Sequence, residues 1–159
     1  MDAIAVVPVA GKELGCVARR PLALGERLVA EAPLLVLTAG TSDESLDALA
    51  AALSPTDHDR LFELAANPDR FGPTKSALAI MATNGIPYRH RRQRHGGVFP
   101  LISRINHACD ANACYKFNPD LGQLTVHATR PIAVDEEITF NCARSFERAF
   151  SKVAALAIA

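Results

Sequence analysis

The sequence has no excess of charge of either sign. Lysine and arginine together number 17, and aspartate and glutamate together number 17, so the formal net charge of the 159 residues is zero. Proteins that hold nucleic acid or anionic membranes by long-range electrostatics carry a positive excess. The balance therefore disfavours a nucleic-acid partner, although it does not exclude a local basic patch.

Long apolar runs are also missing. No stretch approaches the roughly 20 apolar residues that a membrane-spanning helix needs. The N-terminus, Met-Asp-Ala-Ile-Ala-Val-Val, has no basic region before its apolar residues. We therefore expect neither a signal peptide nor a membrane partner.

Cysteine is sparse and is not arranged for metal binding. Cys16, Cys109, Cys114 and Cys142 include no Cys-x-x-Cys pair. This spacing argues against a local zinc site and against a dense disulfide framework. We expect no bound metal, and a cytoplasmic or nuclear location.

The composition fits one folded domain covering residues 1–159. The hydrophobic share is 49% and the charged share 21%, which is ordinary for a domain with a buried core. Strand-like patterns lie towards both ends of the chain and helical ones between them. No internal repeat or linker is evident. We predict an α+β fold that is mostly β.

Local patterns place the main elements. Residues 112–128 alternate around the turn Asn-Pro-Asp-Leu-Gly and predict a β-hairpin. A helical insertion is expected at about 41–84, where Thr41 and Glu44 fit a capping box. The segment 85–97 is rich in arginine and histidine and is predicted to be a solvated loop.

The C-terminal segment has a helical pattern at about 144–158. Its apolar stripe includes Phe146, Phe150 and Val153. Such a stripe needs a partner surface. The helix could pack on its own domain, act as a lid, or form a homodimer.

Three segments together indicate a family. Residues 104–113, Arg-Ile-Asn-His-Ala-Cys-Asp-Ala-Asn-Ala, resemble the Asn-His-x-Cys-x-Pro-Asn motif of SET-domain protein methyltransferases. Residues 128–140, which contain Asp-Glu-Glu-Ile-Thr-Phe, resemble the second motif of that family. Residues 11–25, beginning Gly-Lys-Glu-Leu-Gly, resemble its opening motif. The resemblance covers about residues 10–142 and implies the SET-type β-clip of small sheets.

The resemblance also implies a site for S-adenosylmethionine. Asn106 and His107 match the positions that lie against the cofactor in the family, and their side chains can donate and accept hydrogen bonds. The other residues expected beside the cofactor are Lys12, Glu13, Leu14 and Arg104. Two plainer interpretations stay open: Asn106 and His107 only tie a loop to its neighbours, and residues 11–15 form an ordinary turn.

The sequence departs from the family pattern at its closing motif. Phe140 and Cys142 would line the methyl-transfer channel, but Cys142 stands where family members have a tyrosine. A thiol is smaller and a weaker hydrogen-bond donor than a phenol. It could instead be a small buried hydrophobe. Glu13 replaces a glycine of the opening motif, and no cysteine-rich segment follows Cys142.

Two functions follow from the resemblance and its departures. The first is S-adenosylmethionine-dependent methylation of a protein lysine. The alternative is a SET scaffold that has lost lysine methylation, because function resides in sites and not in folds. It would then serve as a non-catalytic binding protein, or as a biosynthetic enzyme acting on a small molecule.

Overall fold

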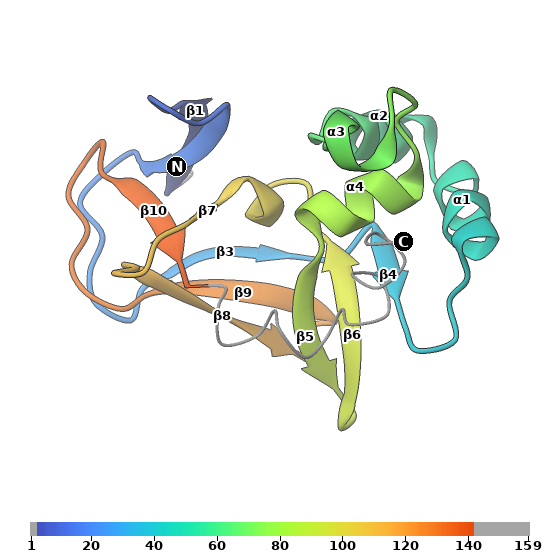
Figure 1. Ribbon diagram of the computed structural model, residues 1–159. Coiled ribbons are helices and arrows are strands. Elements are labelled where there is room, and N and C mark those ends of the chain that lie inside the picture. The colour runs from blue at the N-terminus through green and yellow to red at the C-terminus, as the bar shows by residue number, and fades with distance from the viewer. Residues whose placement is uncertain (1–2, 142–159) are drawn as a thin grey trace. The chain divides into compact units, whose positions relative to one another are not determined.

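In the computed structural model, which describes residues 3–141, the chain divides into two units with different architectures. The first unit contains residues 3–32 and 101–141, and its regular elements are strands apart from one short 3-10 helix. The second contains residues 33–100 and combines helices with a small sheet (Figure 1). That the two units make up one domain stays a prediction.

The first unit is built on one sheet with an extra short strand. Its strand order is β1-β2-β10-β8-β9-β3, and β7 pairs with β10 outside this path. A short 3-10 helix, η1, precedes β7. The elements are β1 (Ile4–Pro8), β2 (Leu14–Ala18), β3 (Arg27–Glu31), η1 (Ile102–Arg104), β7 (Asn106–His107), β8 (Ala113–Asn118), β9 (Gln123–Ala128) and β10 (Glu137–Phe140).

The predicted hairpin at 112–128 is confirmed as β8 and β9. The two strands pair in antiparallel register from Ala113 opposite Ala128 to Asn118 opposite Gln123. Asn118 fixes the turn, because its side-chain oxygen accepts hydrogen bonds from the next two turn amides at 3.0 and 3.2 Å. Gly122 has a φ of 65°, which suits glycine.

Two turns of matching sequence lie side by side in the first unit. Residues 20–26 read Arg-Pro-Leu-Ala-Leu-Gly-Glu and residues 130–136 read Arg-Pro-Ile-Ala-Val-Asp-Glu. Leu22 and Ile132 exchange both of their backbone hydrogen bonds, at 2.9 and 3.0 Å. The expectation of no internal repeat is therefore wrong at the scale of one turn. The repeat was not evident from the sequence, because the two copies are short and far apart.

The same interactions close both turns. In each copy the final glutamate accepts a hydrogen bond of 2.9 Å from the backbone amide three residues earlier. It also pairs with the arginine that opens the turn. The copies differ at three positions, two of which exchange one apolar residue for another. At the third, Gly25 has a φ of 80° and Asp135 a φ of 61°. Left-handed backbone is easy for glycine and costly for aspartate.

The second unit combines four helices with the sheet β4-β6-β5. The helical insertion predicted at about 41–84 is confirmed. The segment predicted to be a loop at 85–97 is instead a hairpin with five paired positions, from Ile86 opposite Gly97 to His90 opposite Gln93. The elements are β4 (Leu35–Leu37), α1 (Asp43–Ala51), α2 (Pro55–Phe62), α3 (Pro68–Phe71), α4 (Ala77–Asn84), β5 (Ile86–His90) and β6 (Gln93–Val98).

Polar side chains set the helix starts. The N-cap of α1 is Ser42, whose oxygen accepts from the Ser45 amide at 3.2 Å. The expected cap, Thr41, accepts instead from the Thr38 amide at 2.9 Å, so the helix begins one residue later than the capping box predicted. Asn67 caps the start of α3, as expected for a residue that accepts first-turn amides.

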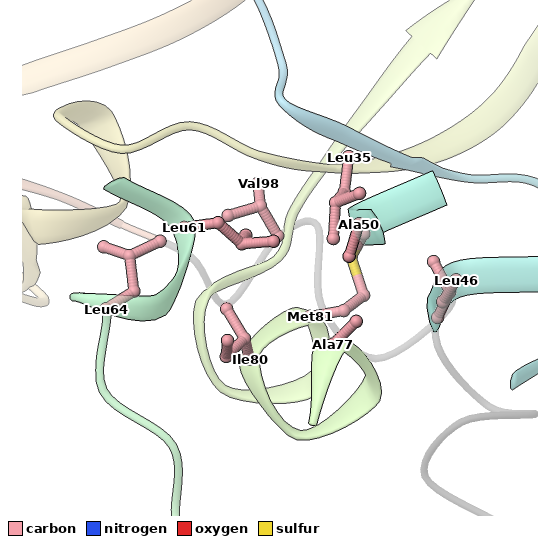
Figure 2. Packing of buried hydrophobic residues seen from close by; sticks show 9 residues of the cluster. All are labelled: Leu35, Leu46, Ala50, Leu61, Leu64, Ala77, Ile80, Met81 and Val98. Carbon is pink, nitrogen blue, oxygen red and sulfur yellow. The ribbon is translucent and has the colours of Figure 1, made fainter. Parts of the chain in front are cut away.

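Leucine, isoleucine and methionine side chains from the helices pack against the small sheet. Figure 2 shows Met81 of α4 pointing towards Ala50 of α1 and Leu35 of β4. The nine clustered residues, all nearly inaccessible to solvent, are Leu35, Leu46, Ala50, Leu61, Leu64, Ala77, Ile80, Met81 and Val98. Burial of this kind is the main driving force for folding the unit.

Two further expectations concern the C-terminal helix and membrane-spanning segments. The predicted helix at about 144–158, and with it the homodimer interpretation, lies outside the described residues. Among residues 3–141, no helix is both long enough and apolar enough to cross a bilayer.

Candidate functional site

β10 brings the three motif segments together in the first unit. On one side it pairs with β2, with Glu137 opposite Val17. On the other it runs parallel to β7, with Thr139 opposite Asn106 and Phe140 opposite His107. Segments that lie far apart in the sequence thus become neighbouring strands, as Figure 1 shows for β10 and β7.

Asn112 holds the Asn-His segment, residues 104–113, against β10 through hydrogen bonds. It is 2% exposed, and its side-chain amide donates to Glu136 Oε1 at 3.0 Å and to the Glu137 carbonyl at 2.8 Å. Its Oδ1 accepts from the Thr139 amide at 2.9 Å. A buried polar side chain is tolerated when its groups are satisfied in this way.

Asn106 is held at the junction, the place where β2, β7 and β10 meet, by two hydrogen bonds from its Nδ2. They go to the Leu14 carbonyl at 3.0 Å and to Glu137 Oε1 at 2.8 Å. Gly15 makes this approach feasible, since a Cβ there would lie 2.8 Å from Asn106 Nδ2. Both amide hydrogens are used, and no donor among residues 3–141 reaches Oδ1. Asn106 therefore presents an acceptor.

Lys12 and Glu137 form an ion pair beside Asn106. Lys12 Nζ lies 2.9 Å from both carboxylate oxygens, and both side chains are partly exposed. Burial opposes ionisation of Glu137, but hydrogen bonds from Lys12 and Asn106 outweigh it and lower the pKa of this carboxyl. Glu137 is thus charged at neutral pH, and the charge of Lys12 is balanced locally.

Glu31 supports the segment that leads into Asn106. Its carboxylate accepts from the Leu101 amide at 3.0 and 3.1 Å and from the Ile102 amide at 2.9 Å, which caps η1. Arg104 ends η1 and is partly buried. Its charge lowers the pKa of nearby Cys16, but burial dominates and raises that pKa to about 12.

His107 lies at the exposed end of this arrangement. Its Nε2 is 3.8 Å from Cys109 Sγ, and both side chains are exposed. No cluster of three His, Cys, Asp or Glu side chains suited to a metal ion occurs among residues 3–141.

Tyr115 is the candidate residue that the sequence analysis missed. Its ring meets Phe140 edge to face, with centroids 5.1 Å apart and planes at 70°. Phe140 is 3% exposed, and the hydroxyl of Tyr115 is buried. The first unit therefore contains a buried phenol against Phe140, although the closing motif lacks a tyrosine. An alternating strand pattern gives no hint of this contact.

Comparison with known proteins identifies the family. Residues 13–143 match the SET domain family model. The chain belongs to the SET-domain family. A curated relative, the histone-lysine N-methyltransferase set5 of Schizosaccharomyces pombe, is 36% identical over 135 residues, covering 84% of this chain. The match covers 40% of that relative's length.

Solved structures agree on the SET fold. A candidate histone methyltransferase of Plasmodium falciparum superposes with a TM-score of 0.52 at 12% identity, covering 92% of this chain and 97% of that one. A humanized mutant of the Polycomb Repressive Complex 2 of Chaetomium thermophilum, bound to an inhibitor, gives a TM-score of 0.53 at 14% identity, covering 93% of this chain and 15% of that one. The same complex, autoinhibited and bound to S-adenosylmethionine, gives 0.56 at 14% identity, covering 98% and 17%.

The SET domain brings some of the predicted site residues together and leaves others apart. Lys12, Leu14 and Asn106 converge around Glu137. Glu13 is exposed on the turn before β2. Cys142 lies outside the described residues, so its expected place in a channel stays a prediction.

Proposed function

We propose that this SET domain catalyses methyl transfer from S-adenosylmethionine to a lysine of a protein. The observation that carries the proposal is the convergence of Asn106, Leu14 and Glu137 where β7, β2 and β10 meet. The identity to a histone-lysine methyltransferase supports it, and suggests histones as substrates and the nucleus as a location.

The residues at this junction fit the cofactor's amino-acid end. An ammonium group needs an acceptor, and the two donated bonds of Asn106 leave its Oδ1 for that purpose. The neutral pairing of Lys12 with Glu137 avoids a net charge beside a ligand that carries both signs. When bound, S-adenosylmethionine supplies an electrophilic methyl group on a sulfonium.

Tyr115 and Phe140 are proposed to form the wall that receives the substrate lysine. Their edge-to-face contact gives an apolar surface with one buried hydroxyl. An apolar wall favours the neutral amine over the ammonium ion, because desolvation disfavours the charged form. The hydroxyl oxygen can accept a hydrogen bond from the amine N–H and so leave the lone pair aimed at the methyl group. The rate gain then comes from orientation and electrostatics.

The two tyrosines of the chain, Tyr88 and Tyr115, provide a matched test. We expect Tyr115→Phe to lower kcat for methylation of core histones by about 100-fold, the typical effect of removing one oriented hydrogen-bonding group from an active site. Tyr88→Phe removes a phenol from the second unit and should leave kcat unchanged. Equal rates for all three proteins would remove Tyr115 from the mechanism.

Cofactor binding is tested separately by calorimetric titration of S-adenosylmethionine. We expect Asn106→Ala to weaken binding by about 10- to 100-fold, the range for a hydrogen bond to a charged group. A thermal melt checks that the variant is folded. Absence of binding to the wild-type chain would overturn the proposal. Binding without transfer to any protein would favour the repurposed scaffold.

A further inference from the structure

The hairpin β5–β6 concentrates the positive charge of the second unit. Its tip, residues 89–94, reads Arg-His-Arg-Arg-Gln-Arg, with four arginines and no acidic residue. Residues 33–85 of the same unit contain seven acidic and three basic residues. The neutral composition therefore conceals a strong separation of charge. The arginine tip is defined here as Arg89, Arg91, Arg92 and Arg94.

The arginine tip is exposed and stands on a rigid base. All four arginines are exposed. At the other end of the ribbon, Tyr88 stacks on His95 with centroids 5.4 Å apart and meets the ring of Phe99 at 6.1 Å. Gly97 admits these rings, since a Cβ there would lie 2.7 Å from Phe99. Figure 1 shows the turn at the end of the ribbon opposite α4.

Folding alone does not favour arginine at these positions. The turn residues Arg91 and Arg92 have φ values of 47° and 67°, where asparagine and glycine are preferred. Arg89 lies directly opposite Arg94 in the ladder, and like charges placed opposite are destabilising. Locally unfavourable choices of this kind concentrate at functional sites.

Neutralising partners within the described residues are few. The ion pairs within residues 3–141 include those of Lys12, Arg20, Arg60 and Arg130. Arg89, Arg91 and Arg92 take part in none of them. Three guanidinium groups thus keep their charge and donors for a ligand.

We propose that the arginine tip docks onto double-stranded DNA. Guanidinium groups match phosphate oxygens in a bidentate geometry. A two-stranded β-ribbon is also one of the few elements that fits the major groove of B-form DNA. The zero net charge of the whole chain disfavoured a nucleic-acid partner. The hairpin changes that expectation by gathering the charge on one narrow ribbon.

The decisive test measures anisotropy of a fluorescein-labelled DNA duplex of about 20 base pairs, two helical turns, with the full chain at several salt concentrations. Three phosphate contacts, from Arg89, Arg91 and Arg92, give a slope of log association constant against log salt of about −2.7. Replacing Arg91→Asn together with Arg92→Gly should reduce the slope to about −0.9, because two contacts are lost.

The same double variant separates binding from folding. Asn-Gly suits this turn, so we expect the thermal midpoint to rise while DNA affinity falls. A purely structural role of the arginines would instead couple lower affinity to lower stability. The matched control, Arg60→Gln with Arg70→Gln, removes equal charge from α2 and α3 and should leave the salt slope unchanged.

Each other outcome overturns the proposal. No binding at low salt, or equal loss in the control, would exclude docking through the tip. Stronger competition by poly-glutamate than by unlabelled DNA would assign the tip to an acidic protein. An RNA duplex that bound equally well would exclude the groove, because the major groove of A-form RNA is too narrow for side-chain entry. None of these readouts depends on methyltransferase activity.

Discussion

At the scale of the residue, Glu137 holds the candidate site together. One carboxylate oxygen accepts from both Lys12 and Asn106, and the other from Lys12 alone. The residue's backbone carbonyl meanwhile accepts from Asn112. Glu137 therefore joins the turn before β2, the Asn-His segment and β10. Its charged state should decide how firmly they are held.

The lowered pKa of Glu137 predicts a specific pH dependence of stability. A carboxyl whose folded pKa lies below its ordinary value of 4.5 stabilises the fold above that value and loses the contribution as pH falls through the folded pKa. We expect Glu137→Gln to lower the free energy of unfolding by about 0.5–1 kcal/mol at pH 7, as for partly exposed ion pairs. Denaturant titrations at several pH values measure the difference.

That difference should shrink steadily below pH 4.5, where wild-type Glu137 takes up its proton. Lys12→Met is the companion variant, because it keeps the Asn106 bond and removes only the ion pair. Its difference from wild type should shrink over the same pH range. A difference that stayed constant down to low pH would show that the charge of Glu137 contributes nothing.

Residue roles could be predicted from sequence only where a motif marked them. Asn106 and Leu14 were found because their motifs are contiguous. Asn112 closes the motif of residues 104–113 but was given no role, and Tyr115 lies outside the three motifs. Their roles were missed because they depend on which strands become neighbours. The contact of Tyr115 with Phe140 follows from one parallel pairing, Phe140 with Ala113, that joins β10 to β8. Strand periodicity carries no information about such pairings.

At the scale of the element, the paired turns at 20–26 and 130–136 offer an internal comparison. Both have the same hydrogen bonds and ion pair, but only one has glycine at the left-handed position. We expect Asp135→Gly to raise the free energy of unfolding by about 0.5–1 kcal/mol, because strain at that φ exceeds the extra entropy glycine gives the unfolded chain. Thermal and denaturant unfolding measure the change.

The reverse exchange serves as the control. Gly25→Asp places the same side chain at a φ of 80°, with no atom within 4 Å of the added Cβ. Its cost is therefore conformational, and stability should fall by a similar amount. If both exchanges changed stability in the same direction, backbone strain would not be the cause.

Helices and strands were predicted correctly where the local sequence determines the structure, and incorrectly where pairing with a distant strand determines it. The hairpin β8–β9 follows from alternation and a strong turn. The hairpin β5–β6 was expected to be a loop, because Arg91 and Arg92 are not turn-forming residues and its strands are polar at one end. It folds as a ribbon because β6 is paired on both sides, with β4 and β5.

At the scale of the whole molecule, the chain order couples the two units. The second unit, residues 33–100, is inserted between the two parts of the first. β3 must pair with β9 across this insertion. Closing a long flexible loop costs conformational entropy, and a folded insertion shortens the effective loop. Folding of the second unit should therefore favour assembly of the first.

This coupling predicts one cooperative unfolding transition. The sequence contains no tryptophan and two tyrosines, one in each unit. In Tyr115→Phe the fluorescence of Tyr88 reports on the second unit, and in Tyr88→Phe that of Tyr115 reports on the first. Coincident denaturant transitions are the test of two-state behaviour. When the core truncation Leu61→Ala is added to either single-tyrosine variant, the free energy of unfolding that the remaining tyrosine reports should fall by about 2–5 kcal/mol. If Leu61→Ala lowered the free energy of unfolding reported by Tyr88 but not that reported by Tyr115, the two units would fold independently. That result would contradict the prediction of one domain.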